Sequence, residues 1–125
     1  MRMIHTPEAP GPAGHYSQAV VHAGFVFVSG QLPIDGEGNV LGAASVADQT
    51  RAVLANIDTI LRAAGSRLDR TVQITIYVTG IDHWPEVNEA YEAVMGEHRP
   101  ARAVIPVEGL HHGVALEVQA IAAVD

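Results

Sequence analysis

Two different periods of hydrophobic and polar positions run along the chain, and they predict where strands and helices form. Residues 16–22 and 24–29 are rich in Val, Phe and Tyr and are separated by a short turn, which is typical of paired strands. Residues 71–79 alternate between apolar and polar side chains, as a half-buried strand does. Two apolar segments, 101–107 and 113–124, predict the last strands. We expect the apolar face of 71–79 to consist of Val72, Ile74, Ile76 and Val78.

Two further segments repeat apolar residues every three or four positions, which predicts helices. The first begins after Ser45, an N-cap residue with Asp48 in the first turn, and ends at Gly65. In the second, Asp82 is expected to be the N-cap, and Pro85 lies in the first turn, where proline is tolerated. The apolar stripe of the first helix is Val46, Val53, Ile57, Ile60, Leu61 and Ala64, and that of the second is Trp84, Val87, Tyr91 and Val94 or Met95.

The resulting order β-β-α-β-α-β-β predicts an α+β fold, a mixed sheet with both helices packed on one face, in a single domain over residues 1–125. Two helices cover only one face of such a sheet. The other face is too apolar for water and too polar for an ordinary core, so we expect it to pack against another copy of the chain. Its predicted residues are Phe25, Phe27, Tyr77, Ala115 and Ile121, mixed with Gln73, Thr75, Glu117 and Gln119.

Charge and composition exclude several functional classes. The net charge is −7, and the seven cations are all arginines. A chain without lysine has no Schiff-base lysine and no phosphate-loop lysine, and its acidity argues against a nucleic-acid or anionic membrane partner. Cysteine is also absent, which excludes disulfides and thiolate sites. The sequence has no apolar run long enough to span a membrane and no signal-peptide core, so we expect a cytoplasmic protein.

Two charged residues stand inside predicted strands, where a charge is costly without a partner. Arg102 lies among Ala101, Ala103 and Val104, and its partner is either a ligand anion or an internal carboxylate. Glu117 lies in the middle of the last strand, where it either pairs with a neighbour or performs chemistry. The internal candidates for pairing with Arg102 are Glu97, Glu108 and Glu117, whereas Arg99 is expected to be a surface charge.

The seven histidines do not form a metal-binding motif. His111 and His112 are adjacent, and the sequence contains neither His-x-His nor His-Glu-x-x-His. We therefore expect no metal site, and we assign His111 and His112 to a turn or to the rim of a cleft.

Four segments resemble the reactive-intermediate deaminase family (RidA, formerly YjgF). They are "GHYSQAV", "FVFVSGQLPID", "VNEAYEAVMGEHRPARAVIPV" and "VALEVQAIA", and they follow in order over nearly the whole chain. The resemblance implies a chorismate-mutase-like fold and a homotrimer with three clefts between subunits. It also implies hydrolysis of enamine and imine acids, such as 2-aminoacrylate and 2-iminopropanoate, to the 2-oxo acid and ammonia. No metal or organic cofactor is implied, and the implied partners are the small imino acid and the other copies of the chain in the homotrimer.

The resemblance assigns roles to four residues. Arg102 clamps the substrate carboxylate and counts as both catalytic and substrate-binding. Glu117 is the second catalytic residue and handles the attacking water. Tyr16 and Ser29 are expected to line the cleft as hydrogen-bond donors. These roles describe a 2-iminobutanoate/2-iminopropanoate deaminase-like hydrolase that acts on C=N bonds.

Some positions depart from the family pattern and affect the substrate more than the reaction. His15, Gln73, Ala103 and Gln119 stand where many relatives carry Pro, Lys, Ser and an acid. His15 and the loop at 110–112 are placed at the mouth of the cleft, so a larger, aminomuconate-like acid is an alternative substrate. A second alternative is a trimer that binds small carboxylates without turnover, which Arg102 would serve equally well.

Overall fold

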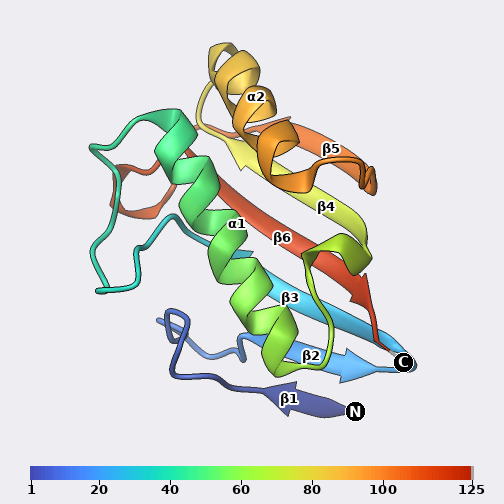
Figure 1. Ribbon diagram of the computed structural model, residues 1–125. Coiled ribbons are helices and arrows are strands. Elements are labelled where there is room, and N and C mark those ends of the chain that lie inside the picture. Colours follow the sequence, from blue (N-terminus) through green and yellow to red (C-terminus); the bar gives the residue numbers. More distant parts are fainter. Residues whose placement is uncertain (125) are drawn as a thin grey trace.

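The computed structural model describes residues 1–124 and has an α+β architecture, as predicted, with both helices on one side of a six-stranded sheet (Figure 1). The strand order is β1-β2-β3-β6-β4-β5, in which β4 and β5 are parallel and the other neighbours are antiparallel. The elements are β1 (Arg2–Ile4), β2 (Ala19–His22), β3 (Phe25–Gln31), α1 (Val46–Ala63), β4 (Thr71–Val78), α2 (Trp84–Met95), β5 (Ala101–Pro106) and β6 (Leu116–Ala123), with short 3-10 turns at Leu68–Arg70, Ile81–His83 and His111–Gly113.

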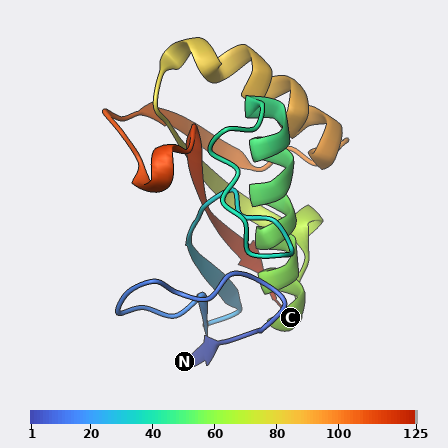
Figure 2. The same cartoon turned by 90° about the vertical axis from the view of Figure 1, so that its left-hand side faces the viewer.

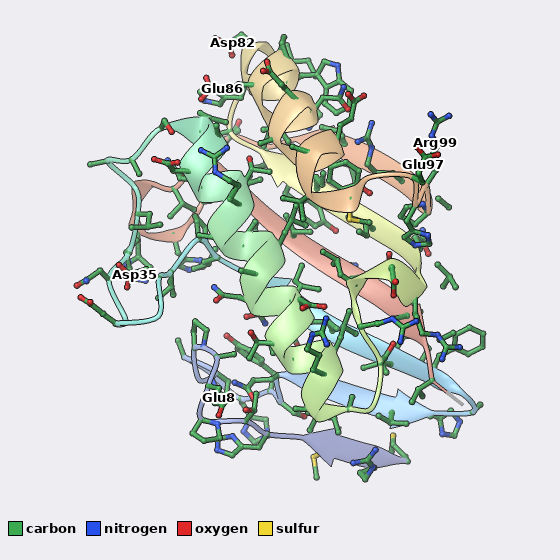
Figure 3. All side chains as sticks on the ribbon, viewed as in Figure 1. Glu8, Asp35, Asp82, Glu86, Glu97 and Arg99 are labelled. Atoms are coloured by element: carbon green, nitrogen blue, oxygen red, sulfur yellow. The ribbon has the colours of Figure 1, made fainter. Side chains whose placement is uncertain are left out.

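Helix α1 forms as its sequence predicts and supplies most of the helical side of the core. The Ser45 hydroxyl accepts a hydrogen bond from the Asp48 N–H at 3.1 Å, and Gly65 follows the helix with φ +85°. Five residues of the predicted stripe are buried, and Val46 packs at its edge. The Glu86 carboxylate of α2, labelled in Figure 3, accepts from the Ala47 N–H at 2.9 Å, so the second helix helps to cap the first.

Helix α2 begins one residue later than predicted, and the assignment of Asp82 as its N-cap is wrong. Asp82 lies in the 3-10 turn Ile81–His83 that precedes the helix, at the upper end of α2 in Figure 3. The N-cap is His83, which makes no side-chain capping bond, and Pro85 lies in the first turn as expected. Sequence reasoning missed the extra turn because its residues continue the helical pattern.

The sequence did not predict strand β1, and it began β2 too early. Three residues are too few to show alternation, and β1 forms because it pairs with β2 and buries Ile4. Before β2, the buried Gln18 side chain turns back to the N-terminal segment. Its Oε1 accepts from the Thr6 N–H at 2.7 Å, and its Nε2 donates to the Pro10 carbonyl at 2.9 Å. These bonds tie Gln18 to the N-terminal segment, and β2 begins at the next residue, Ala19.

A bulge at the start of β4 changes the predicted face of one residue. The register of β4 with β6 shifts between Thr71 and Gln73, so Thr71 turns inward and Val72 is 42% exposed. Ile74, Ile76 and Val78 are fully buried, as the alternation predicts.

Figure 2 shows α1 lying along one side of the sheet. The face of the sheet opposite the helices carries the mixed surface that the sequence predicts. Phe25 and Phe27 are 40% and 44% exposed there, and their rings lie 6.5 Å apart. Ala115 is the exception: it is buried, and its N–H donates to Oε1 of the buried Gln49 at 2.8 Å.

Among residues 1–124, neither helix has the length and apolar content needed to cross a membrane.

Candidate functional site

Three of the four residues predicted for the site line one concavity, on the face of the sheet opposite the helices. Its volume is about 490 Å³. Tyr16 comes from the segment before β2, Ser29 from β3 and Glu117 from β6. The lining residues are Ala13, Gly14, Tyr16, Ser29, Gly30, Leu32, His111, His112 and Glu117.

An irregularity in β3 opens this concavity. The pairing of β3 with β6 is regular from Phe25 to Val28 and resumes, shifted, at Gln31. Ser29 and Gly30 lie in the interruption, beside Glu117. Interruptions of this kind re-aim side chains and are frequent next to active sites.

Gly30 makes room for the Glu117 carboxylate. A Cβ atom on residue 30 would lie 2.1 Å from Oε2 of Glu117, which is far inside van der Waals contact. The carboxylate therefore lies directly over the backbone of Gly30, a relationship between two residues far apart in sequence that no local pattern reveals. Glu117 is half-buried and makes no hydrogen bond or ion pair with any of residues 1–124.

The two hydroxyl groups of the concavity are not equivalent. The Ser29 hydroxyl donates to the Ser17 carbonyl at 2.7 Å, so its only proton is already used and it remains available only as an acceptor. The Tyr16 hydroxyl accepts from the Ala13 N–H at 3.2 Å, which leaves its own proton free to donate. Of the two donors expected from the sequence, Tyr16 is therefore the one able to donate in this conformation.

His111 and His112 lie at the rim, on the 3-10 turn before β6, with ring centroids 6.2 Å apart. His112 has φ +62°, an uncommon backbone conformation for a residue other than glycine. His15 is exposed and is not one of the residues that line this concavity. Within residues 1–124, no three His, Asp or Glu side chains are arranged to hold a metal ion.

Arg102 lies on the other face of the sheet. In the parallel register of β4 and β5, Arg102 is beside Ile74, which is fully buried against the helices. In the antiparallel register of β4 and β6, Glu117 is beside Tyr77, on the opposite face. Neighbouring residues in register point to the same face. Arg102 and Glu117 of one chain therefore point to opposite sides of the sheet and cannot meet.

The surroundings of Arg102 contain no carboxylate partner. Its guanidinium donates to Oδ1 of Asn88 at 3.2 Å, and its Cζ lies 4.6 Å from the ring centroid of Trp84 and 4.7 Å from that of Tyr91. The ion pairs within residues 1–124 involve Arg51, Arg62 and Arg67. None of the three internal carboxylates considered from the sequence pairs with Arg102.

Arg102 lines a second concavity of about 590 Å³ beside the end of α2, together with Asn88, Tyr91, His98 and Arg99. The Tyr91 hydroxyl is buried and has no hydrogen-bond partner within residues 1–124. Burial raises the pKa of the Tyr91 phenol, and the charge of Arg102 offsets part of this rise. Arg99 is exposed at the end of α2, as expected for a surface charge (Figure 3).

Comparison with known proteins gives consistent results over the whole chain. Residues 6–124 match the protein family described as Endoribonuclease L-PSP. A RutC family protein of Pyrococcus horikoshii is 40% identical over 96% of this chain and 95% of its own. A human protein named 2-iminobutanoate/2-iminopropanoate deaminase is 36% identical over 97% of this chain and 88% of its own. The crystal structure of Escherichia coli TdcF with bound serine has a TM-score of 0.92 at 34% identity and covers 100% of both chains.

Proposed function

The chain belongs to the Endoribonuclease L-PSP family, also called the RidA/YjgF family, and we propose that it hydrolyses imine and enamine acids. The substrates are of the 2-aminoacrylate and 2-iminopropanoate type, and the products are the 2-oxo acid and ammonia. The human and rat relatives named as deaminases of such imino acids support this assignment. The observation that carries this proposal is that Arg102 and Glu117 form no ion pair within residues 1–124 and that each lines a concavity.

In the proposed mechanism, Arg102 binds the carboxylate of the substrate. A guanidinium binds a carboxylate in its own plane through two parallel N–H donors, which fixes the position of the attached imine carbon. Serine, the ligand named in the TdcF structure, carries the same carboxylate group. Holding the imine carbon in place makes the attack of a bound water effectively intramolecular.

Glu117 is proposed to handle the water and its protons. Its carboxylate accepts a hydrogen bond from the water and removes one proton as the water oxygen bonds to the imine carbon. That proton passes to the nitrogen, which gives a carbinolamine. The carboxylate then transfers the proton of the new hydroxyl group to the same nitrogen, the C–N bond breaks, and ammonia leaves as the carbonyl forms. One water is consumed for each imine, and no redox step or cofactor is required. The free Tyr16 O–H is suited to donate to the substrate or to the water, and Ser29 to accept.

Because Arg102 and Glu117 of one chain lie on opposite faces, the proposed site needs a second copy of the chain. We propose a homotrimer in which Arg102 of one subunit and the Glu117 concavity of the next form each cleft. The exposed Phe25 and Phe27 on the open face support such an assembly, since large apolar patches on a surface commonly mark interfaces. Each subunit is then one RidA-like domain over residues 1–125.

The description of the family also raises an endoribonuclease function, and the binding of carboxylates without turnover is a further alternative. The net charge of −7 and the lack of lysine favour a small anionic substrate over RNA. Within residues 1–124, Arg51, Arg62 and Arg67 are each paired with an aspartate, so these three are not free to bind phosphates. Release of 2-oxo acid from imines made in situ by an amino-acid oxidase separates turnover from binding.

The rim of the first concavity favours a second candidate substrate class. His111 and His112 form part of this rim, and their ring nitrogens are suited to hydrogen-bond a second polar group of a longer substrate. A larger imino acid, up to an aminomuconate-like acid, is therefore the second candidate. Comparing the imines of alanine, leucine and phenylalanine in the same assay measures the side-chain preference.

Substitution of the two charged residues tests the proposed roles. We expect Arg102→Ala to abolish hydrolysis and to weaken pyruvate binding by about 2 kcal/mol, because a bidentate charged contact is lost. Arg102→Lys should rescue poorly, since an ammonium has no planar fork. Glu117→Gln should still bind pyruvate but slow hydrolysis, because it cannot take a proton. The measurements are steady-state kinetics and calorimetric titration.

The control for loss of positive charge is Arg2→Ala, an exposed arginine on β1 that lines neither concavity and should remain close to wild type. Melting temperatures should change little in all four variants. Substitution of Arg102 or Glu117 breaks no ion pair, because neither residue forms one within residues 1–124. Wild-type rates in Glu117→Gln would make this carboxylate structural. If the Arg102→Ala variant is destabilised but still binds pyruvate normally, Arg102 is a structural residue and not the carboxylate clamp.

Substitution of Gly30 tests the position of the carboxylate. The new Cβ of Gly30→Ala must displace Glu117, so hydrolysis should fall about tenfold to a hundredfold, while the flexible glutamate absorbs the clash and the fold survives. The control is Gly36→Ala, whose Cβ meets nothing within 4 Å and whose φ is not in the left-handed region. Full activity of Gly30→Ala would show that the observed position of Glu117 does not matter for turnover.

The proposed assembly predicts a molar mass. Light scattering at micromolar concentration should give about three times the chain mass of 13.2 kDa. A monomer would leave Arg102 and Glu117 permanently apart and would contradict the mechanism.

A further inference from the structure

Three residues on one side of α2 surround the guanidinium of Arg102. Trp84, Asn88 and Tyr91 are spaced four and three residues apart, so they follow one face of the helix. Trp84 and Tyr91 are seven residues apart, which is two turns or about 10.5 Å along the axis. Asn88 lies between them. The face that they form is turned toward β5, where Arg102 is located.

The distances place the guanidinium between the two rings. Its Cζ is 4.6 Å from the Trp84 ring centroid and 4.7 Å from the Tyr91 ring centroid, within the range of a cation–π contact for both. The Asn88 Oδ1 accepts a hydrogen bond from one terminal nitrogen at 3.2 Å. Arg102 is thus held from three sides although no carboxylate pairs with it within residues 1–124.

These contacts are compatible with binding an anion. A guanidinium has five N–H donors, of which Asn88 takes one. Aromatic rings attract the cation through their negative faces and do not neutralise its charge. An arginine side chain has many rotamers in water, so contacts that hold it in one position remove much of the entropy that ligand binding would otherwise cost.

We propose that Trp84 and Tyr91 are positioning residues, an aromatic clip that holds the Arg102 guanidinium ready for the carboxylate of the substrate. The inference rests on the proposed role of Arg102 as the carboxylate clamp. Asn88 fixes the rotation of the guanidinium between the rings. The clip replaces the acidic partner that an arginine beside an apolar strand would otherwise require, and an acidic partner would compete with the substrate.

The clip also provides its own signal. Trp84 is the only tryptophan in the chain, and its ring contacts the group that is proposed to receive the ligand. Carboxylate binding at Arg102 changes the charge beside the indole. Tryptophan emission of the wild-type protein should therefore change on titration with pyruvate, a reaction product, and should follow the same binding curve as calorimetry.

The test compares ring removal with ring replacement. Trp84→Leu should raise the Kd for pyruvate and the KM for the imino acid about tenfold. Trp84→Phe keeps a ring and should stay within about threefold of wild type. Tyr91→Phe keeps the ring that contacts the guanidinium, so it should weaken binding less than Tyr91→Leu does. The control is Val94→Ala, an exposed apolar residue on α2 that is not part of the clip.

The outcomes separate the clip from the proposed function. If Arg102→Ala loses pyruvate binding while Trp84→Leu folds and binds it normally, the clip is overturned and the clamp stands. If Arg102→Ala hydrolyses and binds normally, the clamp itself is overturned. If Trp84→Leu does not fold, the fluorescence titration decides: wild-type protein that binds pyruvate by calorimetry without a change in emission overturns the clip. Arg102→Ala should show no emission change.

Discussion

Strand alternation separates the two charges on which the proposed chemistry depends. Arg102 is the register neighbour of Ile74 and lies on the face of the sheet that the helices cover. Glu117 is the register neighbour of Tyr77 and lies on the opposite face. A shift of one residue in either register would reverse this arrangement and bury a charge in the core or expose an apolar face. The buried side chains of β4 and β6, with the partly buried Val104 of β5 packed against them, favour these two registers. Packing of the core therefore also places the two charges on opposite faces of the sheet.

Each charge is accommodated without an opposite charge in the described chain. On the helical face, Trp84, Tyr91 and Asn88 hold Arg102. On the face opposite the helices, Gly30 has no side chain and therefore leaves space for the Glu117 carboxylate. Both charged groups keep contact with solvent, so neither suffers the full cost of desolvation. Such groups remain available to a ligand, whereas an internal ion pair would have to break first.

Most of the architecture follows from local patterns, because amphipathic elements of normal length carry their own signal. Helix α1 with its Ser45 cap and the buried residues of β4 are examples. The features that were missed depend on tertiary contacts. Strand β1 is held by pairing with β2, and the inward turn of Thr71 results from a bulge against β6.

The candidate site shows the same division. The four residues assigned by family resemblance include three that share one concavity, Tyr16, Ser29 and Glu117. The sequence did not reveal that Ser29 uses its proton on Ser17, that Glu117 lies over Gly30, or that Arg102 faces away from them. These facts depend on which distant residues the sheet brings together. Residue identity alone does not contain them.

The most direct test of the central claim is a mixing experiment with two inactive variants. Arg102→Ala and Glu117→Gln subunits, coexpressed in equal amounts with different tags, form mixed assemblies that are purified on both tags in turn. If each site takes Arg102 from one subunit and Glu117 from the next, every mixed trimer has one intact site in three, and imino acid hydrolysis should return toward about a third of the wild-type rate. If both residues act within one chain, every chain lacks one of them. A mixed assembly no more active than either variant alone would contradict the account.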